Sequence, residues 1–290
     1  MSINQHSPSN VIEAWQQFLN NQGCSTGTPD GIWGPHTAEG TEAFQKANKL
    51  AVDGLAGPAT LAAAESKGFK APSSNFPPPG FVNTVFDISH LNSHVDLAKA
   101  KAGGMQAVFH KATQYLTFHD NYYRPRMQEA KAAGLLWGAY HFGAGGDGAT
   151  QAKYFLDHAQ PDGNTLLVLD FERDTISGQT NMTITEGANF VEYIYQQTGK
   201  YPGIYGGNYL RDLTKYQGHP TLSKCWLWYA RYLATATPPN GWYRFDFWQY
   251  TDGVHGPDTT PVPGVVGHCD RDAFQGTAEE LAAFWREHGV

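Results

Sequence analysis

Charged side chains are scarce in this chain of 290 residues, where they make up 16% against roughly 25% in typical soluble proteins. Hydrophobic residues make up 41%, which is unlike the composition of disordered chains. No run of about 18 or more apolar residues occurs, so the sequence predicts no membrane-spanning helix. Positive charge is also in deficit, and a net charge of −7 argues against nucleic acid as the main partner.

Cysteine is rare as well. The three cysteines, Cys24, Cys225 and Cys269, are too few and too scattered for a disulfide framework, and we expect reduced, mostly buried thiols. The first ten residues contain no basic stretch followed by an apolar core, so no secretory signal is visible and synthesis in the cytoplasm is expected. His90 and His94 are four residues apart but lack an HExxH motif. We therefore expect no metal and no cofactor.

A proline-rich stretch divides the chain. Residues 69–81 read FKAPSSNFPPPGF, and three consecutive prolines favour an extended polyproline conformation over a helix. We predict a small domain over residues 1–68, a linker over 69–81 and a larger domain over 82–290. Aromatic residues make up 13% of the chain. Aromatic faces suit sugars but also fill hydrophobic cores, so this abundance does not decide between the two.

The small domain contains an internal repeat. Residues 30–37 (DGIWGPHT) and 53–60 (DGLAGPAT) have the same residue at five of eight positions. Asp-Gly favours a turn, and proline after glycine suits the first position of a helix. Apolar residues at helical spacing surround both segments. The pattern predicts a compact unit of three helices with two similar turns.

The larger domain alternates short apolar runs with amphipathic stretches. The runs cover residues 82–89, 105–112, 135–142, 165–172, 201–206, 225–229, 245–250 and, weakly, 262–270. Helical patterns cover 96–102, 122–133, 149–159, 185–198 and 278–288. Strand–helix alternation with about eight strands predicts an α/β fold of the TIM-like (β/α) barrel type. The last strands lack helices between them, so we expect an irregular barrel.

The sharpest chemical signal is a pair of acids after a buried run. Asp170 and Glu172 follow LLVL, and residues two apart on a strand point to the same side, with Cα atoms roughly 6.6 Å apart. Two like charges this close raise the pKa of one group, and a protonated carboxyl group can donate to a glycosidic oxygen. Asp87 and Asp270 end other predicted strands. Because catalytic groups of such barrels lie at the carboxyl ends of the strands, we expect these four acids to converge.

In chain order, eight segments of the larger domain resemble glycoside hydrolase family 25, the Chalaropsis-type lysozymes: FDISH, HKAT, GAYHF, VLDFE, IYGG, WLWYARY, FWQYTDG and CDRDAF. Residues 11–66 resemble the three-helix peptidoglycan-binding domain, with its paired DGxxGxxT turns. The resemblance implies cleavage of the β-1,4 bond from N-acetylmuramic acid to N-acetylglucosamine in bacterial peptidoglycan.

The resemblance also implies roles for individual residues. Glu172 matches the general acid, Asp170 assists by orienting the substrate acetamido group, and Asp87 and Asp270 line the cleft. Implied substrate contacts are Tyr140, His141, Lys111, Tyr205, Trp228, Trp248 and Gln249. Implied wall-binding residues of the small domain are Asp30, Trp33 and Asp53.

The residues leave the mechanism and the exact substrate open. Direct displacement by water needs carboxylates about 6.5–9.5 Å apart and a retaining nucleophile about 5–5.5 Å, and the strand spacing does not choose between them. We favour substrate-assisted retention, because a second acid lies beside the expected proton donor. A family 18 chitinase would carry a further Asp at position 168, where this chain has Val168. A glucosaminidase and a non-catalytic wall-binding protein are also compatible with the sequence.

The expected place of action is the bacterial cell wall, reached by a route that needs no signal peptide. A phage endolysin released through a holin fits, and so does an effector injected by a secretion system, whose producer would need an immunity protein. An amino-terminal binding domain favours Gram-negative walls, and so the periplasm. We expect the chain to act as a monomer.

Overall fold

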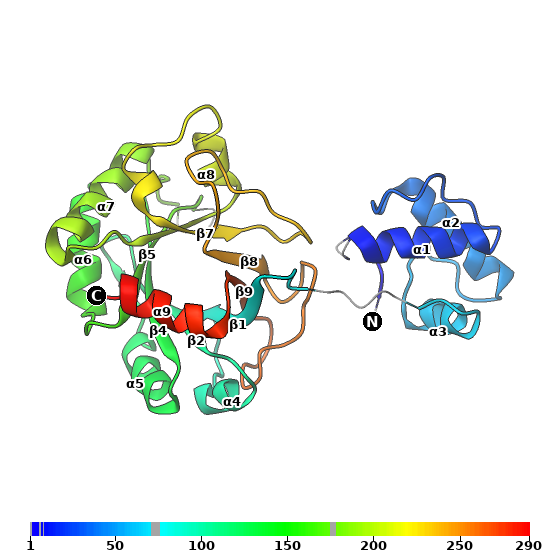
Figure 1. Ribbon diagram of the computed structural model, residues 1–290, viewed down its shortest axis with the longest axis horizontal. Helices are drawn as coiled ribbons and strands as arrows, with labels where there is room; N and C mark the ends of the chain where they lie inside the picture. The colour runs from blue at the N-terminus through cyan, green and yellow to red at the C-terminus, as the bar shows by residue number, and fades with distance from the viewer. Residues whose placement is uncertain (1, 6, 8, 71–75, 175–177) are drawn as a thin grey trace. The chain divides into compact units, whose positions relative to one another are not determined.

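The computed structural model describes residues 2–5, 7, 9–70, 76–174 and 178–290 and divides the chain into two compact units (Figure 1). The first unit contains α1 (Ser9–Asn21), α2 (Pro35–Ala47) and α3 (Pro58–Ser66). The second is a barrel that begins with β1 (Phe81–Ile88). Part of the predicted linker, residues 71–75, lies outside the described residues. Within the described part of the chain, no helix is long and apolar enough to cross a membrane.

An aromatic core holds the helical unit together. The ring of Trp15 lies 5.5 Å from that of Phe18 and 5.1 Å from that of Phe69, and Phe44 packs edge-on to both α1 rings. Phe69 is 5% exposed, so the prediction that residue 69 belongs to the linker is wrong. Phe69 follows α3 closely, and burial of its apolar ring in the helical core lowers the free energy relative to exposure to water.

Eight strands close the barrel. Their bounds are β1 (Phe81–Ile88), β2 (Ala107–Gln114), β4 (Leu136–Phe142), β5 (Thr165–Asp170), β6 (Gly203–Gly206), β7 (Trp226–Ala230), β8 (Phe247–Thr251) and β9 (Asp270–Gln275). Neighbours are parallel from β1 through β2, β4, β5, β6 and β7 to β8, and β9 closes the ring between β8 and β1 in the antiparallel sense. The two-residue strand β3 (Phe118–His119) pairs with β2 outside the ring.

Helices follow most of the parallel strands. They are α4 (Leu97–Ala102), α5 (Tyr123–Ala133), α6 (Gly148–Ala159), α7 (Ile184–Thr198), α8 (Asn208–Leu213) and, after β9, α9 (Ala278–His288). The predicted α/β irregular barrel preceded by a helical unit is thereby confirmed. The predicted strand over 262–270 is wrong, because β9 starts where that run ends. The inward positions at the start of β9 are the acids Asp270 and Asp272 rather than apolar residues. A search for apolar runs therefore misses the start of this strand.

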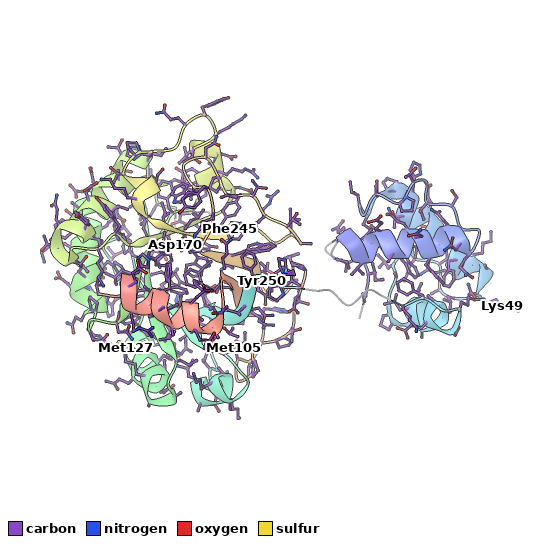
Figure 2. All side chains as sticks on the ribbon, viewed as in Figure 1. Lys49, Met105, Met127, Asp170, Phe245 and Tyr250 are labelled. Carbon is purple, nitrogen blue, oxygen red and sulfur yellow. The ribbon has the colours of Figure 1, made fainter. Side chains whose placement is uncertain are left out.

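The barrel interior is filled rather than open. Phe109 of β2 stacks on Trp228 at 4.4 Å, and its ring leaves so little room that a Cβ on Gly138 would lie 2.1 Å from it. At the amino ends of the strands, α9 packs Phe284 and Trp285 into the same core, and Trp285 Nε1 donates to the carbonyl of Trp137 at 2.9 Å. Figure 2 shows how closely the side chains are packed in the barrel, with Asp170 among them. Because apolar side chains fill the interior, we expect the functional polar side chains at the carboxyl ends of the strands.

Candidate active site

Five acidic side chains meet at the carboxyl ends of the strands, and we call them the carboxyl cluster: Asp87, Asp170, Glu172, Asp270 and Asp272. Asp87 lies near the end of β1 and Asp170 is the last residue of β5. Asp270 is the first residue of β9, not the end of a strand as predicted, yet it pairs directly with Asp87. An antiparallel strand starts at the edge where its parallel neighbours end, so the expected convergence holds for a different reason.

A hydrogen-bonded chain fixes Asp87. Gln249 Nε2 donates to Asp87 Oδ2 at 2.7 Å, and the Tyr205 hydroxyl donates to Gln249 Oε1 at 2.8 Å. The carboxyl groups of Asp87 and Asp270 also hydrogen-bond to each other. Burial raises the pKa of both groups; the charge of Asp272 raises that of Asp87 further, and the charge of Asp87 raises that of Asp270 further. A hydrogen bond between two carboxyl groups requires a proton, which this arrangement places on Asp270.

Asp170 and Glu172 form the second acidic pair. Asp170 is 5% exposed and Glu172 is half-buried. Burial raises the pKa of both groups, and the charge of Glu172 raises that of Asp170 further. The Lys111 ammonium opposes this by lowering both pKa values. Asp170 Oδ1 has no hydrogen-bond partner among the described residues. The pair therefore combines raised pKa values, which favour a protonated carboxyl group, with an unpaired acceptor atom, Asp170 Oδ1.

Tyr140 lies at the centre of these acids. Burial raises the pKa of its hydroxyl well above the usual value, and four carboxyl groups add to the effect: Asp87, Asp170, Asp270 and Glu172. Lys111 is close by, with Nζ 5.9 Å from the Tyr140 ring centroid and 3.2 Å from Gln114 Oε1. Tyr140 and Lys111 thus lie beside the carboxyl cluster, and their contact with substrate stays a prediction.

The fifth acid, Asp272, was not predicted from the sequence. It is fully buried, and its Oδ1 accepts from Trp228 Nε1 at 2.7 Å. Trp228 in turn contacts Tyr205 edge-on at 4.8 Å, so Asp272 fixes the indole that forms the floor of the site. Its spacing from Asp270 was the available signal, because residues two apart on β9 share a side.

The barrel and the helical unit both match known protein families. Residues 86–259 match the family described as glycosyl hydrolases family 25, and residues 8–64 match a putative peptidoglycan binding domain. The chain belongs to glycosyl hydrolase family 25. It is therefore a glycoside hydrolase by family, and the resemblance found in the sequence is confirmed.

Individual members of family 25 are similar over most of the barrel. Lysozyme M1 of Streptomyces globisporus is 27% identical over 216 residues, which cover 68% of this chain and 69% of that protein. The N,O-diacetylmuramidase of Arthroderma benhamiae is 30% identical over 236 residues, covering 75% of this chain and 97% of that protein. The bacterial lysozyme structure from Streptomyces coelicolor gives a TM-score of 0.62 at 27% identity, covering 70% of this chain and 97% of that one.

Two residues assigned to the sugar site lie elsewhere in this family 25 barrel. His141 is fully buried on the outer side of β4, stacked on Phe190, with its ring nitrogens 2.8 Å from Thr113 Oγ1 and 3.2 Å from Gln151 Oε1. Burial lowers its pKa to about 3. The prediction that His141 contacts substrate is therefore wrong, because adjacent residues on a strand face opposite sides and Tyr140 takes the inner one.

Trp248 also points to the outer face of its strand, for the same reason. It is 1% exposed, its Nε1 donates to the carbonyl of Arg231 at 2.7 Å, and its ring packs against Phe245 at 5.7 Å. The next residue, Gln249, takes the inward position on β8. The predicted sugar contact of Trp248 is therefore wrong, and this indole serves the packing of the outer face.

In the helical unit, two buried glutamines hold the repeated turns in the same way. Gln16 Nε2 donates to Asp30 Oδ1 at 2.8 Å, and its Oε1 accepts from the Asp30 N–H at 2.9 Å. Gln45 Nε2 donates to Asp53 Oδ1 at 2.7 Å, and its Oε1 accepts from the Asp53 N–H at 3.0 Å. These hydrogen bonds, with those from backbone N–H groups, lower the pKa of both aspartates.

The structure therefore assigns Asp30 and Asp53 to turn formation, whereas the sequence resemblance implied wall binding. Trp33 is half-buried and packs against the helical core. Contact of these three side chains with a wall polymer stays a prediction. Within the described part of both units, no three His, Cys, Asp or Glu side chains form a group that could hold a metal ion.

The raised pKa of Asp270 predicts a pH-dependent contribution to stability. A carboxyl group whose pKa is raised on folding stabilises the fold below its unfolded pKa of about 3.9, and this contribution is lost as the pH rises through the folded pKa. Asn mimics the protonated group at every pH. Relative to wild type, the Asp270→Asn variant should therefore gain unfolding free energy as pH rises above about 4, measured by urea titration from pH 4 to 8.

Asp147→Asn is the matched control. Asp147 caps α6 by accepting from the Thr150 N–H at 2.7 Å, which lowers its pKa. Its contribution is fully present above the unfolded pKa of about 3.9, so the difference between the Asp147→Asn variant and wild type should stay nearly constant from about pH 5 to 8. A constant difference between the Asp270→Asn variant and wild type across this range would contradict the buried proton.

Proposed function

We propose that this family 25 glycoside hydrolase is an N-acetylmuramidase that cleaves the β-1,4 bond from N-acetylmuramic acid to N-acetylglucosamine in bacterial peptidoglycan. The lysozyme and muramidase names of the relatives support this substrate. The observation that carries the proposal is the Asp170–Glu172 pair, in which burial raises both pKa values at the mouth of the barrel.

Glu172 is the proposed general acid. It is the more exposed of the pair, so it reaches a bound polymer more readily than the deeper Asp170. A carboxyl group with a raised pKa keeps its proton near neutral pH and can pass it to the leaving oxygen. The Lys111 charge limits the rise in pKa, which keeps the proton transferable.

Asp170 is proposed to orient the substrate. Its Oδ1 is buried and has no partner among the described residues, so it can accept from the N–H of a sugar acetamido group. A hydrogen bond donated to a carboxylate favours its charged form and lowers its pKa. Substrate binding would therefore leave Asp170 ionised, and its negative charge would favour the protonated form of Glu172, which is the arrangement that catalysis needs.

This geometry favours substrate-assisted retention. With Asp170 holding the acetamido N–H, the acetamido oxygen attacks the anomeric carbon while Glu172 protonates the leaving oxygen. Water then opens the cyclic intermediate as Glu172 takes back a proton. The sugar is held by Tyr140 and Tyr205, while Trp228 and Gln249 keep the acids in place through Asp272 and Asp87.

The helical unit is proposed to bind peptidoglycan and to raise the concentration of the barrel at its insoluble substrate. Action at the bacterial wall follows from this proposal, whether the chain is delivered as a phage lysin or as an effector.

The Glu172→Gln substitution tests the acid. We expect kcat on purified peptidoglycan to fall about 10²–10⁴-fold, since the amide has no proton to give. Cosedimentation with the same peptidoglycan should be unchanged. The matched control is Glu129→Gln on the exposed side of α5, which should keep full turnover. Full turnover by Glu172→Gln would remove Glu172 from the mechanism.

Product stereochemistry tests the route. Retention predicts that the first-formed product carries the β-anomer, because two inversions occur at the same carbon. Proton NMR of a soluble substrate, recorded before mutarotation, reports the anomer directly. An α-anomer formed first would rule out the substrate-assisted route and favour direct attack by water.

A further inference from the structure

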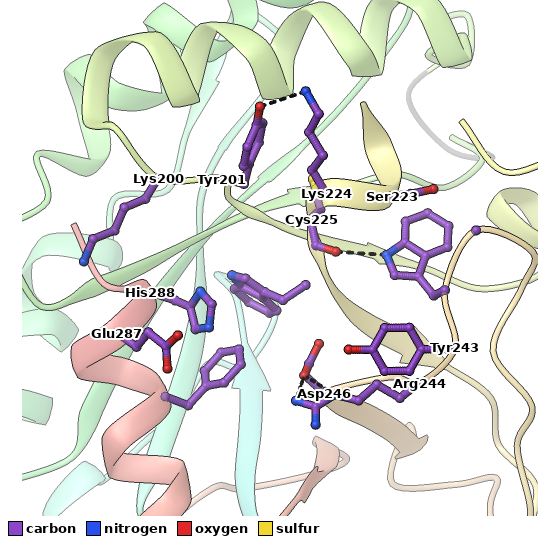
Figure 3. Close-up of a pocket in the computed structure, with 14 residues that line it drawn as sticks. Lys200, Tyr201, Ser223, Lys224, Cys225, Tyr243, Arg244, Asp246, Glu287 and His288 are labelled. Atoms are coloured by element: carbon purple, nitrogen blue, oxygen red, sulfur yellow. Dashed lines mark hydrogen bonds and ion pairs between the residues drawn. The ribbon is translucent and has the colours of Figure 1, made fainter. Parts of the chain in front are cut away.

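A cavity of about 540 Å³ opens at the amino ends of the strands, away from the carboxyl cluster. Figure 3 shows the side chains that line it. Its lining comes from the segments that precede β6, β7 and β8 and from the last turn of α9. We call it the amino-end cavity and define it by Tyr201, Lys224, Trp226, Trp242, Tyr243 and Arg244. Its volume lies within the range of about 300–1,000 Å³ that is typical of ligand sites.

Aromatic side chains dominate the rim. Tyr243 is 93% exposed, which is unusual for a ring of this size and leaves its face free for contact. Trp242 is half-buried and held in place by its Nε1, which donates to the carbonyl of Cys225 at 2.9 Å. Tyr201 is fixed by stacking on Tyr195 at 4.1 Å. Tyr243 and Trp242 therefore offer aromatic faces, the kind of surface on which the C–H faces of sugar rings pack.

A buried donor without an acceptor lies in the wall of the cavity. Trp226 is 7% exposed, and its indole Nε1 has no hydrogen-bond partner among the described residues. Gly203 supports the ring from behind, since a Cβ there would lie 2.4 Å from it. Buried N–H groups in folded proteins are nearly always paired. This donor, unpaired within the described part of the chain, could therefore donate to an acceptor oxygen of a molecule bound in the cavity.

The lysine and arginine side chains around the cavity already have hydrogen-bond partners. Lys224 Nζ donates to Tyr201 Oη at 2.9 Å and lies 3.3 Å from Glu192 Oε1, and Arg244 Nε donates to Asp246 Oδ1 at 3.0 Å. Lys200 Nζ donates to the carbonyl of Gly289 at 2.6 Å. Lys224 and Arg244 lie beside carboxylates, and Lys200 donates to a backbone carbonyl. The cavity therefore suits a neutral ligand rich in hydroxyl and carbonyl oxygens better than a polyanion.

We infer that the amino-end cavity binds a neutral, N-acetylated amino-sugar segment of a glycan strand, separate from the site of hydrolysis. The acetamido carbonyl would accept from Trp226 Nε1, and the sugar rings would pack on Tyr243 and Trp242. The identity of the polymer as peptidoglycan rests on the proposed function. The cavity would give the barrel a second binding site for an insoluble substrate.

The experiment titrates the full chain with chitotetraose and follows indole N–H signals in ¹H–¹⁵N NMR spectra, with Trp226→Phe used to assign its own signal. We expect the Trp226 signal to shift in a saturable way. Tyr243→Ala should weaken this binding about fivefold or more, because it removes one aromatic face. Tyr216→Ala is the matched control, since Tyr216 is 90% exposed and does not line the cavity.

Activity separates this inference from the proposed function. Tyr243→Ala should slow the release of fragments from insoluble peptidoglycan and leave the rate on soluble fragments unchanged. A Trp226 signal that stays unmoved at saturating chitotetraose, or equal affinities for the Tyr243→Ala and Tyr216→Ala variants, would overturn the cavity inference while hydrolysis continues. A shifted Trp226 signal without hydrolysis of any substrate would instead support the cavity and remove the proposed function.

Discussion

The burial of several carboxyl groups at one end of a barrel is the constraint on which the rest of this structure depends. Removing a carboxylate from water is costly unless it is protonated, paired or hydrogen-bonded. Each acid meets this condition differently. Asp87 accepts from Gln249 and shares a proton with Asp270, Asp272 accepts from the Trp228 indole, and the Asp170–Glu172 pair lies in the field of Lys111. The groups that satisfy these acids come from other strands of the same barrel: Gln249 from β8, Trp228 from β7 and Lys111 from β2.

Strand topology makes this concentration of acids possible. An all-parallel barrel brings only strand ends to its active edge. Here β9 runs antiparallel between β8 and β1, so its first residues lie at that edge. Asp270 and Asp272 share its inner side. Asp270 pairs with Asp87 of β1, and Asp272 accepts from Trp228 of β7. The opposite end of the barrel is closed by α9, whose Phe284 and Trp285 complete the apolar core beneath the cluster.

Much of the site could be predicted where local pattern and tertiary position coincide. Asp170 and Glu172 follow a run of buried apolar residues, so their strand and its end are evident. The inner and outer faces of β4 and β8 could not be told apart in this way. Both sides of these strands are buried, so His141 and Trp248 follow the same apolar pattern as the inward residues. Asp272 was missed because a buried acid has no apolar signature.

The small domain shows the same limit. The repeated Asp-Gly turns were visible in the sequence, but their partners Gln16 and Gln45 lie in the preceding helices. A hydrogen bond between a helix side chain and a turn leaves no periodic pattern in the sequence. The resemblance implied wall binding by Asp30 and Asp53, and the structure adds that their Oδ1 atoms are bound within the turns.

The most direct measurement is the chemistry of the newly formed chain ends. Purified peptidoglycan is digested with the full chain, reduced with borohydride and analysed by mass spectrometry. A muramidase generates new reduced muramic acid ends, which is the result that this account predicts. Reduced glucosamine ends would show that the same acids cut the other bond of the glycan strand, and the absence of any new reduced end would contradict hydrolysis by the carboxyl cluster.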